Sequence, residues 1–246
     1  MTIQPGPPAG GRCGAATIRY AVYFAPHRDC PWRAFGAAWL GRDEIEDVPW
    51  PQPAEGHHGT ADIAALTAAP RRYGFHATLK APFRLSSGHS GDDLLARLRQ
   101  LARQQRRIPL GRLEPVWLDG FVALVPAVAP PALHSLAAAC VTELDDLRAP
   151  ATQAERERRS IPAEDVRGQE LMARYGYPQV LERFRFHMTL TGPVAAPVAQ
   201  EIIARVTPAV ARLNEQAPLK LDRLCLFAQP SPHASFRRLA DVELPA

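Results

Sequence analysis

The 246-residue sequence has little cysteine, little lysine and no long apolar run. Its four cysteines are scattered and form no Cys-x-x-Cys pair, which excludes a disulfide framework and a zinc ribbon. No stretch approaches about 18 consecutive apolar residues, so we expect no membrane span. Lysine occurs only at Lys80 and Lys220, so arginine carries most of the net charge of +4. This mild excess permits an anionic substrate without requiring one.

What is present is typical of a soluble globular protein, with 46% hydrophobic and 22% charged residues. The first 17 residues are rich in Gly, Pro and Ala, and they lack the basic start and apolar run of a secretory signal. We therefore expect residues 1–17 to form a disordered tail and residues 18–246 to form a single bilobal domain. The expected location is cytoplasmic.

Hydrophobic periodicity predicts a mixture of strands and helices. Aromatic-rich and alternating segments favour strands at 19–24, 73–80, 113–118, 120–126, 184–190 and 219–227. Spacing of three and four residues favours helices at 32–40, 62–68, 92–106, 131–147, 163–174 and 198–213. The order of a strand, a long helix and a further strand occurs twice. The sequence therefore predicts an α+β fold of two pseudo-symmetric lobes around a central cleft, each with an antiparallel sheet and flanking helices.

One short phrase occurs in both halves of the chain. Phe75–Leu79 reads aromatic, His, apolar, Thr, Leu, and Phe186–Leu190 repeats this pattern. Side chains alternate between the two faces of a strand, so each copy has an apolar face and a polar face. In the expected strands the polar faces carry two histidines, two threonines and two cations: His76, Thr78 and Lys80 in the first copy, and His187, Thr189 and Arg185 in the second.

This constellation suits acid–base chemistry on a phosphate ester. Histidine titrates near neutral pH, so one imidazole can accept a proton while the other donates one. The hydroxyls of Thr78 and Thr189 can hydrogen-bond the non-bridging phosphate oxygens. Lys80 and Arg185 can neutralise the charge that develops there. No metal is required, and we expect neither a metal nor another cofactor.

The His-x-Ser/Thr pattern alone is weak evidence for a site, because four of the eight histidines have Ser or Thr two residues later. His58 and His233 share it but lie in segments predicted as loops, and we interpret both as coincidence. In the other two copies the residues around the histidine also match. This match favours a functional role for His76 and His187 over a purely structural one.

The longer stretches Arg71–Phe83 and Phe184–Gly192 resemble the 2H phosphoesterase superfamily, which is named for two His-x-Thr/Ser motifs. They are similar to a subgroup often encoded with phosphonate-metabolism genes. Arg19–Phe24, Trp39–Arg42 and Tyr175–Pro178 extend the resemblance, which runs from about Ile18 to the end of the chain.

The resemblance implies two sheets around a cleft and a metal-independent phosphodiesterase, a phosphoric diester hydrolase of the cyclic phosphodiesterase type. It implies an acid–base pair of His76 and His187, with Thr78 and Thr189 holding the phosphate. Strand parity adds three predicted substrate-binding residues, Lys80, Arg185 and Tyr23. Tyr23 is either a packing aromatic or a stacking platform for a base or sugar.

The substrate would be a cyclic or 2′,5′-linked phosphodiester in a small molecule, a nucleotide or an RNA end. A ribose cyclic phosphate is also possible by gene-neighbourhood analogy. We expect a monomer that does not bind membranes. The sequence leaves open the physiological substrate, which histidine is the base, and the direction of hydrolysis or ligation.

Two other interpretations use the same residues. A binding module would grip a nucleotide or RNA end with little turnover, although such a module has no need of two matched histidines. A metalloenzyme would use both histidines as ligands, but neither motif contains Asp or Glu and the chain has no His-x-x-x-His.

Overall fold

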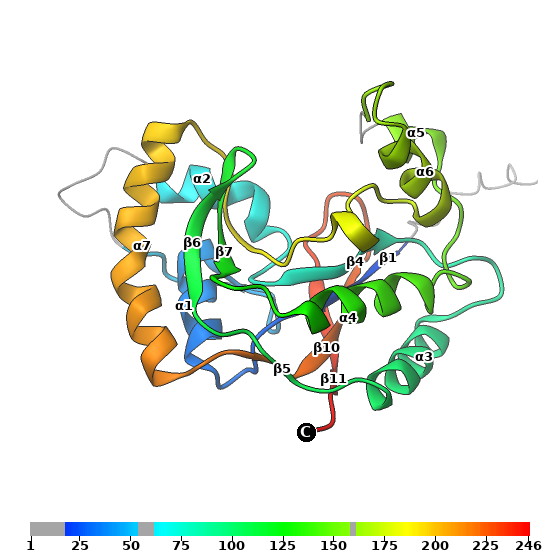
Figure 1. Ribbon diagram of the computed structural model, residues 1–246, viewed down its shortest axis with the longest axis horizontal. Helices are drawn as coiled ribbons and strands as arrows, with labels where there is room; N and C mark the ends of the chain where they lie inside the picture. Colours follow the sequence, from blue (N-terminus) through cyan, green and yellow to red (C-terminus); the bar gives the residue numbers. More distant parts are fainter. Residues whose placement is uncertain (1–17, 54–61, 158–160) are drawn as a thin grey trace, which may run out of the picture.

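A computed structural model describes residues 18–53, 62–157 and 161–246, and it confirms the predicted α+β class (Figure 1). The strands are β1 (Arg19–Phe24), β2 (Arg42–Asp43), β3 (Val48–Pro49), β4 (Ala77–Phe83), β5 (Ile108–Pro109), β6 (Leu113–Leu118), β7 (Phe121–Pro126), β8 (Met188–Pro193), β9 (Lys220–Leu221), β10 (Arg223–Gln229) and β11 (Arg237–Glu243). The helices are α1 (Pro31–Leu40), α2 (Ile63–Arg71), α3 (Gly91–Arg103), α4 (Pro131–Thr142), α5 (Gln153–Glu157), α6 (Val166–Tyr175), the 3-10 helix η1 (Leu181–Arg183) and α7 (Ala196–Gln216).

The two sheets expected from the repeat form one seven-stranded sheet, in the order β11-β10-β1-β4-β8-β7-β6. All neighbouring strands are antiparallel. At the centre, β4 and β8 pair only at Ala77 and Met188. This single pair divides the sheet into the β4 half (β11-β10-β1-β4) and the β8 half (β8-β7-β6). The topology therefore does not show two separate lobes, each with its own sheet.

Each half of the sheet is covered by the helix that follows its motif strand. Helix α3 follows β4 and packs against β10 and β11, whereas α7 follows β8 and packs against β6 and β7. Helices α4 and α2 contact the two central strands, β4 and β8 respectively. Figure 1 shows α1, α2 and α7 gathered beside the β6-β7 hairpin, with α3 and α4 on the other side of the molecule.

Local signals explain where several helices begin and end. Ser90 and Asp93 form a capping box at the start of α3, in which each side chain bonds to the other residue's backbone N–H. The side chain of Asp62 accepts from backbone N–H groups at the start of α2. Helix α1 ends at Gly41, whose φ of 76° is the left-handed conformation that glycine adopts at low cost.

The main core lies between the sheet and the helices. Strand β1 shows that the opposite face of the sheet is buried in a separate cluster. Val22 and Phe24 belong to the main cluster of buried apolar residues. Ala21 and Tyr23 point to the opposite face, where they pack in a second cluster with Phe227. This alternation is the period of two expected for a strand that is buried on both faces.

The predicted strands differ from the structure at the two motifs. Both motif strands begin immediately after the histidine, at Ala77 and at Met188, rather than at 73 and 184. Residues 184–187 instead follow the 3-10 helix η1, and 73–76 follow the end of α2. Strand β11 was not predicted. No helix within the described ranges is both long and apolar enough to cross a membrane. The predictions for residues 1–17 and for His58 lie outside the described residues.

Candidate active site

The two motifs come together where the halves of the sheet meet. Ala77 and Met188 face each other and point into the core, where both are fully buried. In an antiparallel register their chain neighbours then face each other on the opposite side of the sheet. Thr78 therefore lies opposite His187, and His76 lies opposite Thr189. The register thus brings the four predicted residues to one face as a quartet.

Both imidazoles are held in the same way. His76 Nδ1 lies 2.9 Å from the carbonyl oxygen of Gly74, and His187 Nδ1 lies 2.8 Å from that of Arg185. A carbonyl oxygen only accepts, so Nδ1 carries the proton in each ring and Nε2 is left as the acceptor. The Thr78 hydroxyl donates to His76 Nε2 at 3.3 Å. Each histidine thus presents the nitrogen that can take a proton from a bound group.

His76 is enclosed by aromatic rings. Tyr23 lies opposite Thr78 in the neighbouring strand and stacks on the imidazole, with ring centroids 3.8 Å apart. Tyr73 lies 6.1 Å away by the same measure. Burial and, to a smaller extent, the nearby His187 lower the pKa of His76 to about 4, although the hydrogen bond to the Gly74 carbonyl acts in the opposite direction. His76 is therefore uncharged at neutral pH. Burial raises the pKa of the Tyr23 phenol well above its usual value.

His187 lies in more polar surroundings. Burial lowers its pKa, the Arg185 guanidinium also lowers it, and the Asp119 carboxylate raises it. Arg185 Nη2 and Asp119 Oδ2 form an ion pair in which both side chains are largely exposed. Asp119 lies in the turn between β6 and β7, and the Phe121 ring is 5.7 Å from the imidazole. The β6-β7 hairpin thus supplies the surroundings of the second histidine.

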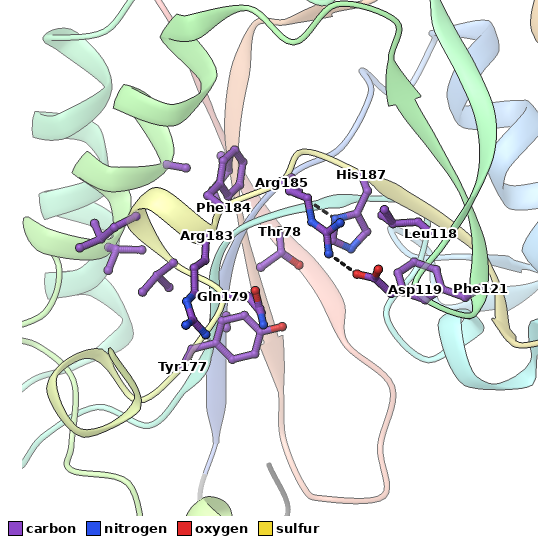
Figure 2. Close-up of a pocket in the computed structure, with 16 residues that line it drawn as sticks. Thr78, Leu118, Asp119, Phe121, Tyr177, Gln179, Arg183, Phe184, Arg185 and His187 are labelled. Carbon is purple, nitrogen blue, oxygen red and sulfur yellow. Dashed lines mark hydrogen bonds and ion pairs between the residues drawn. The ribbon is translucent and has the colours of Figure 1, made fainter. Parts of the chain in front are cut away.

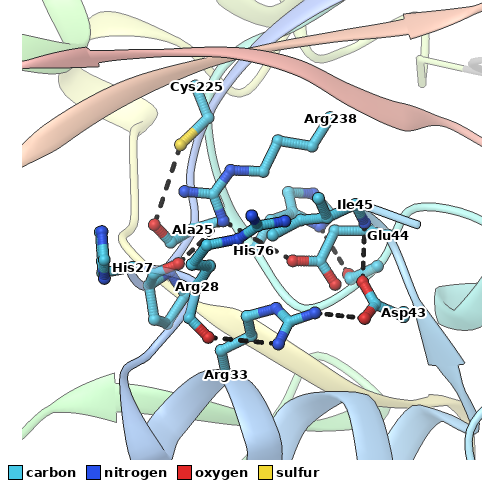
Figure 3. Close-up of polar contacts among 12 residues, drawn as sticks. Ala25, His27, Arg28, Arg33, Asp43, Glu44, Ile45, His76, Cys225 and Arg238 are labelled. Atoms are coloured by element: carbon cyan, nitrogen blue, oxygen red, sulfur yellow. Dashed lines mark hydrogen bonds and ion pairs between the residues drawn. The ribbon is translucent and has the colours of Figure 1, made fainter. Parts of the chain in front are cut away.

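A buried polar layer lies behind His76 (Figure 3). The Glu44 side chain is almost completely buried, and neither of its carboxylate oxygens has a hydrogen-bond partner in the described part of the chain. Burial raises the Glu44 pKa, while Arg238, whose Nη1 is 3.7 Å from Glu44 Oε1, lowers it. Gly74 has φ +78°, and a Cβ atom there would lie 2.5 Å from Glu44 Cβ. Only glycine therefore fits at the position whose carbonyl orients His76.

Two adjoining pockets meet at the quartet. The His187 pocket has a volume of about 210 Å³, and its polar lining comprises Thr78, Asp119, Tyr177, Gln179, Arg183, Arg185 and His187 (Figure 2). The His76 pocket has a volume of about 490 Å³, and its aromatic and polar lining includes Arg19, Tyr23, Tyr73, His76, Thr78, Glu155, Tyr177 and Thr189. Both pockets are lined by Thr78, Ala81, Phe121 and Tyr177. A ligand at the threonines can therefore extend into either pocket.

Of the three predicted substrate-binding residues, two line the pockets and one does not. Tyr23 and Arg185 line the His76 and His187 pockets respectively. Lys80 is buried and lines neither of them. Its ammonium donates to the Val141 carbonyl at 2.9 Å and to Asp145 Oδ1 at 3.3 Å. Burial lowers the Lys80 pKa to about 8. The structure therefore brings Tyr23 and Arg185 to the quartet and separates Lys80 from it.

Sequence reasoning missed several residues that line the pockets. Asp119 had no signal beyond its place in a predicted turn, and its ion pair with Arg185 depends on the pairing of distant strands. Tyr177 was noticed only as part of the family resemblance, although it lines both pockets. His233, interpreted as a coincidental match, has an exposed side chain in the β10-β11 connection.

Within residues 18–53, 62–157 and 161–246, no group of three or more His, Cys, Asp or Glu side chains is arranged to hold a metal ion. The groups that the site offers are the two imidazoles, the threonine hydroxyls and the arginines.

Comparison with known proteins gives a family and two curated relatives. Residues 78–237 match the family described as "Protein of unknown function (DUF1045)". The chain is 37% identical over 222 residues to "Ribose 1,5-bisphosphate phosphokinase PhnN" of Janthinobacterium sp. (strain Marseille), covering 89% of this chain and 49% of the relative. It is 38% identical over 220 residues to the protein of the same name from Laribacter hongkongensis (strain HLHK9), covering 89% and 50%. The chain thus spans about half the length of the curated relatives it matches.

These names correct the predicted enzyme class. Both relatives are named phosphokinases, so the expectation of a phosphoric diester hydrolase is wrong. The physical reason is that two histidines and two hydroxyls prepare a phosphorus centre for transfer, but nothing in the motifs selects water as the acceptor.

The PhnN names and the family match support the predicted association with phosphonate metabolism, and they leave membership of the two-histidine superfamily untested. The family match extends over more than half of the sequence, and it shows that the chain belongs to the DUF1045 family.

Proposed function

We propose that the protein catalyses phosphoryl transfer between a phosphodiester and a hydroxyl acceptor at a phosphorylated ribose, by two-histidine acid–base catalysis without a metal, as a member of the 2H phosphoesterase superfamily. The observation that carries the proposal is the matched arrangement of His76 and His187. Each Nδ1 is hydrogen-bonded to the carbonyl of the second residue before it, which leaves Nε2 as the acceptor in each ring, and the Thr78 hydroxyl lies 3.3 Å from His76 Nε2. The relatives' name supports a phosphorylated ribose as the substrate class.

In this proposal a phosphate binds between the motifs, and Thr78 and Thr189 donate to its non-bridging oxygens. The Thr78 hydroxyl turns from His76 Nε2 to the phosphate, which frees that nitrogen to accept a proton. One neutral imidazole accepts the proton of the attacking hydroxyl. The other must be protonated to donate to the leaving oxygen. The negative charge of a bound phosphate favours protonation of a nearby imidazole, which offsets the lowering of the pKa by burial. The substrate therefore supplies the electrostatic condition that the acid needs.

The sequence contains no Gly-x-x-x-x-Gly-Lys-Ser/Thr phrase, because Lys80 and Lys220 both follow leucine. The polar groups that face the site are instead the histidines and threonines of the two motifs.

The test is to incubate the full chain in EDTA with 2′,3′-cyclic nucleotides, ribose cyclic phosphates and 2′,5′-linked dinucleotides. Phosphorus NMR of the products identifies the acceptor, whether water, a hydroxyl or a phosphate. We expect His76→Ala and His187→Ala each to lower turnover by about 10²–10⁴-fold, the usual contribution of a positioned acid or base.

His233→Ala is the matched control, because it removes a histidine of the same His-x-Ser/Thr pattern from an exposed position. It should leave turnover unchanged. Equal rates in all three variants would contradict the proposal.

A second candidate is a binding module for a nucleotide or RNA end. The observation that favours it is Tyr73, a partly exposed aromatic residue in the His76 pocket, because an aromatic face can stack on a base. Nucleotide binding without turnover, retained in both histidine variants, would support this candidate over the catalytic one.

A further inference from the structure

The two pockets beside the quartet differ in the charged groups that line them. The His76 pocket has one guanidinium, Arg19, whose Nε donates to the neutral Gln229 Oε1 at 2.8 Å, and one carboxylate, Glu155, which pairs with Arg84 at 3.2 Å. The smaller His187 pocket is lined by two guanidinium groups, Arg183 and Arg185, and by a single carboxylate, Asp119. Its volume of about 210 Å³ lies below the ~300–1,000 Å³ of a pocket for a drug-sized molecule, so it suits one small polar group.

The two arginines are not equivalent. Arg183 is fixed by Asp165, because its Nη1 and Nη2 lie 2.7 Å and 2.5 Å from the two carboxylate oxygens. Arg185 contacts Asp119 through Nη2 alone, and among the described residues its Nε and Nη1 have no hydrogen-bond partner. The side chains of Arg185 and Asp119 are 56% and 62% exposed, and exposed ion pairs contribute little to stability. A bound anion can therefore replace Asp119 as the partner of Arg185 with little loss of folding stability.

We propose that the His187 pocket is a second anion subsite, which binds a terminal phosphomonoester of the substrate while the reacting phosphate lies at the threonines. Arg185 provides the planar fork that binds phosphate oxygens in pairs. Gln179 and Tyr177 add neutral polar groups around the same space (Figure 2). The inference rests on the proposed function, because it makes the substrate a sugar with two phosphoryl groups. It also moves Arg185 from the reacting phosphate, where the sequence placed it, to the second one.

The binding experiment compares ribose 5-phosphate with unmodified ribose by isothermal titration calorimetry on the full chain. Wild type should bind ribose 5-phosphate at least about tenfold more tightly than ribose, since charge-assisted bidentate contacts are strong. Arg185→Gln should abolish this difference. Asp119→Asn, which removes the competing carboxylate, should tighten binding of ribose 5-phosphate.

The matched control is Arg97→Gln, because Arg97 forms a similarly exposed ion pair with Asp146 and lines neither pocket. Thermal melts of the variants establish that each is folded. Equal affinity of Arg185→Gln and Arg97→Gln for ribose 5-phosphate would overturn the subsite, as would equal affinity of wild type for ribose and ribose 5-phosphate.

A turnover experiment separates this inference from the proposed function. Its substrates are a nucleoside 2′,3′-cyclic phosphate with and without a 5′-phosphate. We expect Arg185→Gln to raise KM for the 5′-phosphorylated compound relative to KM for the compound without the 5′-phosphate. If both compounds react equally well in wild type and in Arg185→Gln, the subsite fails while the reaction stands. If neither compound reacts but Arg185 still governs binding of ribose 5-phosphate, the reaction fails and the subsite stands.

Discussion

The two histidine motifs share four of five residues in sequence but differ in what surrounds them. His76 is stacked beneath Tyr23 at 3.8 Å and its pKa is lowered to about 4, whereas His187 lies beside an exposed Arg185–Asp119 ion pair. The backbone hydrogen bond to Nδ1 is the same in both. Backbone carbonyls just before each phrase therefore orient the two rings alike, while the surrounding side chains make the tendency of each ring to take a proton different.

The two halves of the sheet also differ in the kind of side chains that they place around their histidine. The β4 half surrounds its histidine with aromatic rings and a buried polar layer, and the β8 half surrounds its histidine with charged groups at the surface. Protonation of His76 is opposed mainly by the loss of water. Protonation of His187 is also adjusted by two charges of opposite sign.

The largest expected effect comes from removing the ring that encloses His76. Tyr23→Ala should lower the free energy of unfolding by about 3–5 kcal/mol, the usual cost of truncating a buried aromatic residue. It should also raise the His76 pKa from about 4, because water would reach the imidazole. Denaturant unfolding and NMR titration of the histidine ring measure the two effects.

Tyr23→Phe is the control, because it keeps the stacked ring and removes only the hydroxyl. It should leave the His76 pKa where it is. A His76 pKa that stays low in Tyr23→Ala would show that the enclosure does not set it.

A smaller effect is expected at the residue whose carbonyl holds His76. Gly74→Ala should lower the free energy of unfolding by about 2–4 kcal/mol, because it combines a positive φ with a clash against Glu44. Gly111→Ala isolates the backbone contribution, since Gly111 has φ +68° and open space around its Cβ position. Chemical denaturation should show the larger loss for Gly74→Ala. Equal losses would mean that the approach of Glu44 costs nothing.

The smallest expected effect lies at the second histidine. Asp119→Asn should lower the His187 pKa, because the carboxylate raises it, and Arg185→Gln should raise the same pKa. Both variants should unfold within about 0.5 kcal/mol of wild type, as exposed substitutions usually do. NMR titration of His187 is the measurement. Shifts of the same sign in the two variants would contradict the assignment of the two charges.

Most helices and strands could be predicted from the sequence, because their apolar spacing matches the way they are buried. Helix α1 and strand β6 lie close to the expected 32–40 and 113–118. Strand β11 was missed because its buried and exposed positions belong to a charged segment, Arg237–Glu243, whose pairing with β10 is not encoded locally. The joining of two sheets into one depends on a single long-range pair that no periodicity reveals.

The strand-parity argument worked only as far as the backbone is extended. It predicted that His76, Thr78, His187 and Thr189 share a face, and the register at Ala77 and Met188 places them so. Lys80 departs from that face because β1 and β4 change register between Val22 and Tyr23, and its ammonium meets Asp145. Arg185 precedes its strand, so parity says nothing of its direction, and its contact with Asp119 sets it instead.

The order of strands has a consequence for how the chain can be cut. The β8 half is drawn from one stretch of the chain, residues 113–193, whereas the β4 half joins β1 and β4 to β10 and β11 from the other end. Trimming the chain back from residue 243 therefore unravels the edge of the half that carries His76 and leaves every ladder around His187 complete. Truncation that disturbs the strands beside His76 would therefore leave the strand pairing beside His187 in place.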